Sequence, residues 1–89
     1  MTKSEYCQLY DQLLYGHDAD LQIDGHRFFI EWNDSEIAVY QMHESSGTSI
    51  AVLRGENSGE IVNALFEYPL IDGKSLNQSY QQITILDIE

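Results

Sequence analysis

Two histidines and three aspartates lie within ten positions of one another, in the stretch from His17 to His26. Imidazole nitrogens and carboxylate oxygens are common ligands of divalent metals and common groups in acid–base catalysis. This stretch is therefore the first candidate for a metal or catalytic site. A calcium-binding EF-hand loop counted from Asp18 does not fit, because Ile23 and Phe29 occupy positions that need glycine and glutamate.

A hairpin turn divides this cluster. The pair Asp24 and Gly25 favours a two-residue type I′ turn, because both central positions of that turn need positive φ. Such a turn pairs Ile23 with His26 and places Asp18 at the opposite end of the strand. We therefore expect two separate groups of polar side chains rather than one site.

One end of the expected sheet collects carboxylates. Turns between the later strands bring further acidic residues to the end where the first strand begins, and Arg54 and His17 are the only bases expected nearby. Carboxylates gathered in this way favour binding of a positively charged partner. We call this group the acidic rim; its residues are Asp18, Asp20, Asp34, Glu36 and Glu56.

His26 and His43 are the candidate metal ligands at the other end of the sheet. They face each other if the turn at 33–36 has two or four loop residues, and Asp24 and Glu44 then flank them. A three-residue loop moves His43 to the other face and removes the pair. Structural zinc sites usually carry cysteine or closer ligand spacing, so the favoured interpretation is two strand-end histidines with no metal or other cofactor.

No arrangement of residues predicts catalysis. Cys7 borders the apolar stripe of the first helix and has no expected cation beside it, so we expect it to pack. No serine lies in a Gly-x-Ser-x-Gly elbow, and the loop at 55–60 lacks the lysine of a phosphate-binding loop. The chain is therefore expected to be non-enzymatic, with no catalytic residues.

Helix signals mark both halves of the chain. Apolar residues recur at helical spacing from Tyr6 to Leu14, and Thr2 with Glu5 forms a capping box in front of them. Gly16 is expected just beyond the end of this helix. A second apolar stripe at 61–68 follows a cap pair of Asn57 and Glu60 and ends before Pro69.

Strand signals lie between and after these helices. Residues 21–23, 26–32, 37–43 and 48–53 are expected to form the strands, and 75–82 and 83–88 a short helix and a final strand. The predicted fold class is α+β, as one small domain over residues 1–89. It has an N-terminal helix, an antiparallel meander of three to four strands, a second helix and a short C-terminal helix and strand.

The expected strands have one apolar face and one mixed face. Alternation places Leu21, Phe28 and Ile30 together on the core face. Aromatic and arginine side chains on the other face are typical anchors of protein interfaces if no helix covers them. Cover by the second helix or the C-terminal segment is the equal alternative. The candidate partner-binding residues on this face are Arg27, Phe29, Glu31 and, depending on register, Tyr40.

The charge balance narrows the class of partner. Fifteen acidic residues against four Lys and Arg give a formal net charge of −11. Such a surface disfavours direct binding to nucleic acid and to acidic membranes, which both need cationic side chains. No signal segment or long apolar run occurs, so a cytoplasmic protein is expected. The expected partner is a protein that carries positive charge.

In size, acidity and order of elements, the chain resembles small acidic inhibitor proteins of phages and mobile elements, including anti-CRISPR proteins and other DNA mimics. The resemblance rests on the order of the elements, which is one helix, then three or four strands, then a second helix. No motif is shared. It implies an inhibitor that binds a basic nucleic-acid-binding protein by mimicking phosphate charge. The alternatives are a small structural or regulatory homodimer and a histidine-based metal-binding domain.

Overall fold

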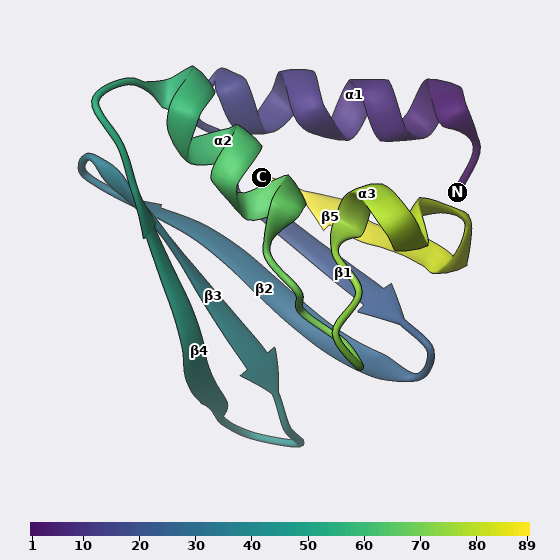
Figure 1. The fold of residues 1–89 in the computed structure, drawn as a ribbon. Helices are drawn as coiled ribbons and strands as arrows, with labels where there is room; N and C mark the ends of the chain where they lie inside the picture. Colours follow the sequence, from purple (N-terminus) through teal and green to yellow (C-terminus); the bar gives the residue numbers. More distant parts are fainter.

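The structure, a computed structural model, describes residues 1–89 and has an α+β architecture (Figure 1). One helix opens the chain, four strands follow, and two helices, a 3-10 turn and a last strand close it. The predicted class is therefore confirmed. The elements are α1 (Lys3–Leu14), β1 (Ala19–Ile23), β2 (His26–Asn33), β3 (Glu36–Met42), β4 (Gly47–Arg54), α2 (Ser58–Glu67), α3 (Leu76–Ser79), η1 (Tyr80–Gln82) and β5 (Ile83–Ile88).

Local hydrogen bonds set both ends of α1. The Thr2 hydroxyl accepts from the Glu5 backbone N–H at 3.2 Å, and the Glu5 carboxylate accepts from the Thr2 N–H at 2.9 Å. These bonds satisfy two of the N–H groups that a helix start leaves without partners. At the other end, Gly16 adopts φ 93°, a conformation that favours glycine. The predicted capping box and helix end are confirmed.

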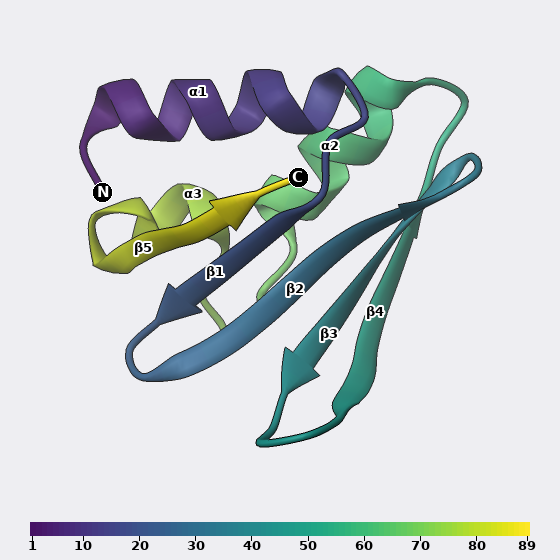
Figure 2. The ribbon, with the colours of Figure 1, turned by 180° about the vertical axis from the view of Figure 1, so that it is seen from behind.

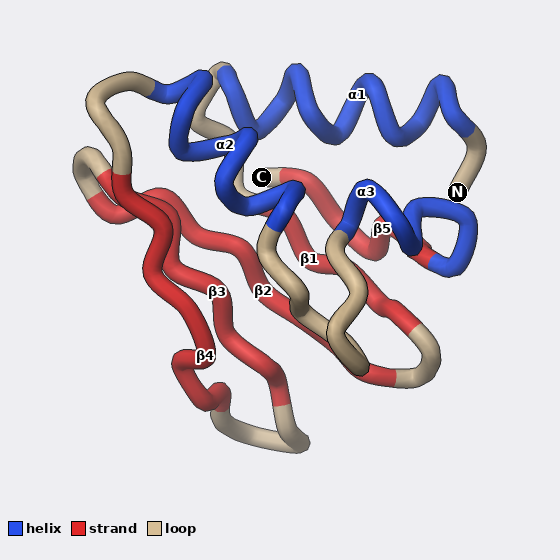
Figure 3. The backbone as a smooth tube through the Cα atoms, viewed as in Figure 1, coloured by secondary structure: helices blue, strands red, loops and turns tan.

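The ends of α2 also follow from the sequence. Asn57 Oδ1 accepts from the Glu60 N–H at 2.9 Å, which is the predicted cap. The helix ends at Glu67 because Tyr68 precedes Pro69 and is therefore extended, with ψ 131°. The loop that follows runs down beside β2 before the chain returns to α3 (Figure 3).

Two tight turns set the register of the meander. Asp24 and Gly25 have φ 49° and 80°, and β1 pairs with β2 in the predicted register. The next turn also contains two loop residues, because Asn33 pairs with Glu36. All four strands of the meander are present, and each pairs antiparallel with the next.

The sheet contains one strand more than predicted. The C-terminal strand β5 pairs antiparallel with β1, so the strand order is β4-β3-β2-β1-β5. The meander leaves β1 with an open edge, and β5 fills it. This pairing joins residues far apart in the sequence, and the local pattern of 83–88 does not specify which edge it selects.

All three helices pack on one face of the sheet and enclose the core (Figures 1 and 3). α1 and α2 bring their apolar stripes onto the inward side chains of β1, β2 and β3. No helix is both long enough and apolar enough to cross a membrane. The largest fully buried side chains are Phe28, Phe66, Leu9, Leu13, Leu21, Ile23, Ile30, Ile37, Leu65, Leu76, Ile83 and Val39.

The opposite face of the sheet has no helix in front of it (Figure 2). The sequence left open whether this face is covered or uncovered, and the structure shows that it is uncovered. Neither α2 nor the C-terminal segment covers the outer face, because α2 packs on the inner side and β5 extends the sheet edgewise.

Candidate functional site

The uncovered face of the sheet has an aromatic centre. Phe29 on β2 pairs with Tyr40 on β3 and with Asp20 on β1, so the three side chains share this face. Both rings are half-buried among their cross-strand neighbours. The four residues predicted for this face do lie together. With two apolar neighbours they form what we call the sheet-face patch: Arg27, Phe29, Glu31, Tyr40, Met42 and Val52.

An ion pair lies beside this aromatic centre. Arg27 Nε donates to Asp20 Oδ1 at 2.9 Å, and a second guanidinium nitrogen donates to Oδ2. The Asp20 side chain is 13% exposed and that of Arg27 is 55% exposed. Hydrogen bonding to Asp20 and its charge raise the pKa of the Arg27 guanidinium. The pair links β1 and β2, and the charge of the arginine is already matched by Asp20.

A second ion pair occupies the other arginine. Arg54 Nε donates to Glu36 Oε1 at 3.3 Å across β3 and β4. Glu31 and Asp87 form no ion pair. Asp87 lies opposite Asp20 on the neighbouring strand. Like charges in that position repel each other. The outer face therefore keeps unmatched negative charge.

The acidic rim forms only in part. Asp18, Asp34, Glu36 and Glu56 lie at one end of the sheet as predicted, but Asp20 belongs to the outer face, where Arg27 holds it. Asp18 Oδ1 accepts from the Trp32 backbone N–H at 2.9 Å, so the Asp18 carboxylate is engaged in an internal hydrogen bond that ties the start of β1 to β2.

Two members of the rim are therefore exposed and form no ion pair, namely Asp34 and Glu56. β5 adds Asp87 and Glu89 at the Asp18 side of this end, because the Glu89 N–H donates to the Asp18 carbonyl at 2.9 Å. The sequence missed these two residues because the partner of β5 was not predicted.

The two candidate metal ligands have separate partners. The two-residue turn at 33–36 sets the register that was expected to align His26 with His43, but β3 ends at Met42, before the second histidine. His26 Nδ1 lies 3.4 Å from the Gln41 side-chain amide, and His43 Nε2 lies 3.2 Å from Thr48 Oγ1. No group of three or more His, Cys, Asp or Glu side chains is arranged to hold a metal ion.

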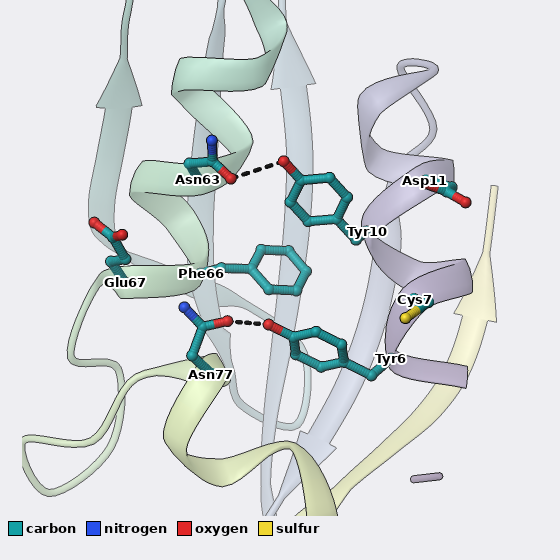
Figure 4. Close-up of a pocket in the computed structure, with 8 residues that line it drawn as sticks. All are labelled: Tyr6, Cys7, Tyr10, Asp11, Asn63, Phe66, Glu67 and Asn77. Carbon is teal, nitrogen blue, oxygen red and sulfur yellow. Dashed lines mark hydrogen bonds between the residues drawn. The ribbon is translucent and has the colours of Figure 1, made fainter. Parts of the chain in front are cut away.

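A groove lies between α1, α2 and α3, on the other side of the molecule from the sheet-face patch (Figure 4). Tyr6 and Tyr10 of α1 pack edge-on against Phe66 of α2, with ring centroids 5.4 and 5.3 Å away. Tyr10 donates to Asn63 Oδ1 at 2.7 Å, and Tyr6 donates to Asn77 Oδ1. Burial, and then the nearby ionisable groups of Cys7, Tyr10 and Tyr80, raise the pKa of the Tyr6 hydroxyl.

The rim of this groove carries Cys7, Asp11 and Glu67, all exposed. The expectation that Cys7 is a packing residue at the border of the apolar stripe is wrong, because Cys7 is exposed on α1 beside the tyrosines. The sequence assigned both tyrosines to the core stripe and did not predict a groove. Tyrosine rather than leucine at these positions was the available signal, because a tyrosine commonly places its hydroxyl where a polar partner is in reach.

Comparisons with known proteins add no assignment to either surface. No protein-family model, curated protein or solved structure matches the chain.

Proposed function

We propose that this chain is a non-enzymatic, cytoplasmic protein-interaction module whose sheet-face patch docks on a basic protein. The observation that carries the proposal is the difference between the two faces of one sheet. Helices cover one face, and nothing in the chain covers the other, which bears two aromatic rings and an arginine. Side chains of these types supply most of the binding energy at many protein interfaces.

Charge on and around the patch favours a basic partner. Both arginines of the outer face are held by its own carboxylates, whereas Glu31 and Asp87 are unmatched. The formal net charge of −11 adds a long-range attraction for cationic surfaces. Association driven in this way is fast at low ionic strength and weakens as salt screens the charges.

In its more specific form, the proposal is that the partner binds nucleic acid and that this chain inhibits it. Asp34 and Glu56 are exposed at the end of the sheet, just beyond the patch. Lysine and arginine side chains that bind phosphate also bind carboxylate, through charge-assisted hydrogen bonds. The chain and the nucleic acid then compete for the same cationic groove.

The experiment is capture of a partner from a lysate of the source cells. Phe29→Thr combined with Tyr40→Thr removes both rings and keeps residues that favour strands. The control, Tyr15→Thr, removes a ring that is 82% exposed at the end of α1 on the helical side. We expect the wild type and the control to retain the same basic protein and the double variant to lose it.

Two further measurements on the captured complex distinguish a basic partner in general from a nucleic-acid-binding partner that the chain inhibits. Rising salt should release the captured protein, and added nucleic acid should displace it. If salt releases the captured protein but nucleic acid does not displace it, the proposal of inhibition is contradicted, and the proposal of a basic partner stands. Equal retention by the double variant contradicts the docking surface. Capture of only a second copy of this chain supports the alternative function, a structural or regulatory homodimer.

A further inference from the structure

The groove between α1, α2 and α3 lies on the helical side of the molecule, away from the sheet-face patch (Figure 4). Its volume of about 300 Å³ is the largest of any cavity in the structure. Tyr6 and Tyr10 stand on either side, and Phe66 lies between them. Ligand pockets in proteins begin at about this size, roughly 300 Å³, so the space suits a small group such as one side chain.

The hydrogen bonds in the groove leave acceptors available. Both tyrosine hydroxyls use their hydrogen on an asparagine oxygen, Tyr6 on Asn77 and Tyr10 on Asn63. The hydroxyl and amide oxygens each retain lone-pair capacity. Each amide turns its nitrogen away from the tyrosine it binds (Figure 4). A ligand at the open side of the groove, beside Phe66 and the two tyrosines, therefore meets these oxygen acceptors.

The charged side chains that line the groove are all negative. Asp11 and Glu67 are exposed on opposite helices, neither forms an ion pair, and no Lys, Arg or His lines the groove. The faces of tyrosine rings also attract cations. An anion is repelled here, and a neutral apolar group leaves the acceptors unpaired. The chemistry that fits is an organic cation with several N–H donors.

We propose that this groove binds the guanidinium group of an arginine side chain on a partner protein. A guanidinium is planar, stacks on aromatic rings and presents five N–H donors, and it is less strongly hydrated than an ammonium group. Its donors suit the tyrosine and asparagine oxygens, and its positive charge is attracted by Asp11 and Glu67 at the two edges of the groove, whose side chains point away from the rings (Figure 4). This site is on the helical layer and does not depend on the sheet-face patch.

The test is an NMR titration of the isotope-labelled protein with N-acetyl-arginine amide. N-acetyl-citrulline amide is the neutral control of nearly the same shape, and N-acetyl-lysine amide tests a cation that does not stack. We expect saturable shifts of the Asn63 and Asn77 side-chain amide signals with the arginine probe, weaker binding of the lysine probe, and no response to citrulline. Equal shifts with citrulline, or no shifts at these amides with arginine, overturn the proposal.

Charge-removal variants distinguish binding of the probe in the groove from a general attraction of a cation to an acidic protein. Asp11→Asn with Glu67→Gln changes two exposed helical positions, and Asp34→Asn with Glu56→Gln removes the same charge from the acidic rim. We expect the first pair to raise the dissociation constant of the arginine probe about two- to fivefold. The second pair should leave it unchanged.

Equal weakening by both pairs shows that the probe responds only to net charge and overturns the proposal. Tyr10→Phe keeps the ring and removes one acceptor oxygen, so it should also weaken the arginine probe. If Tyr10→Phe and the Asp11→Asn, Glu67→Gln variant both bind the arginine probe as tightly as the wild type does, the proposal that the groove is the binding site is overturned. The dispersion of the backbone spectrum reports whether each variant remains folded, so a loss of binding is not confused with unfolding.

Discussion

Phe28 and Phe29 are adjacent in β2 but have different environments. Phe28 is 1% exposed beneath the helices, whereas Phe29 is half-buried on a face that no helix covers. Their side chains differ only in the direction that strand alternation gives them. Alternation therefore decides the side of the sheet, and helix docking decides whether that side becomes core.

Charge explains why the helices dock on one face only. The inner face presents side chains such as Leu21, Ile30 and Ile37, which lose nothing polar when a helix covers them. The outer face carries the Asp20–Arg27 pair and Glu31. Removing such charges from water is costly unless new partners replace the water. A partner with complementary charge can provide that replacement, and the helices of this chain cannot.

Alanine at each of the two phenylalanines gives the largest contrast. Phe28→Ala leaves a cavity in a packed core and should lower the free energy of unfolding by about 3–5 kcal/mol. Phe29→Ala loses only half-buried area and should cost about 1 kcal/mol. Urea unfolding followed by circular dichroism measures both values. Comparable losses for the two variants would contradict the distinction between the faces.

Trp32 tests how firmly α1 is tied to the inner face. Its indole N–H donates to the Leu13 carbonyl at 2.8 Å, next to the end of the helix. Trp32→Phe removes this hydrogen bond and keeps an aromatic ring, so we expect a loss of about 1 kcal/mol in the free energy of unfolding. The control Tyr15→Phe alters a ring outside the core and should have no measurable effect. A larger loss in the control would show that the exposed end of α1, and not the indole, holds the helix.

The capping box of α1 should give the smallest effect, one that depends on pH. Hydrogen bonds from the backbone and side chain of Thr2 lower the pKa of Glu5 below its ordinary value of 4.5. A lowered pKa in the folded state stabilises the protein above pH 4.5, and this contribution disappears as the pH falls through the folded-state value.

Melting temperatures of the wild type and Glu5→Gln check this sign. The wild type should melt at a higher temperature at pH 6, and the difference should shrink toward pH 3. The variant should bind any sheet-face partner as the wild type does, because α1 lies on the covered side. A difference that grows in acid would contradict the role of the ionised carboxylate.

Much of the fold was predictable because its signals are local. Asp24 and Gly25 specify their own turn, and Thr2 and Glu5 specify their own cap, in each case from residues within four positions. The side of Phe29 follows once that turn is known. The pairing of β5 with β1 was not predictable, because no local signal distinguishes one open edge from another.

The candidate sites divide in the same way. Alternation placed Arg27, Phe29 and Tyr40 on one face, but whether a helix covers that face depends on packing between distant elements. The groove depends on three helices meeting, so Asn63 and Asn77 approach Tyr10 and Tyr6 from far along the chain. The acidic rim was overestimated, because carboxylates that were counted as free serve Arg27, Arg54 and the Trp32 N–H.

Photo-crosslinking from the outer face tests whether the sheet-face patch is the docking surface in the cell. The photoreactive residue p-benzoyl-phenylalanine replaces Phe29 in one protein and Tyr15 in another, and both are illuminated in the source cells. Docking through the sheet-face patch predicts one discrete adduct with a basic protein from position 29 and none from position 15. No adduct at position 29, an equal adduct at both positions, or an adduct made only of two copies of this chain would contradict it.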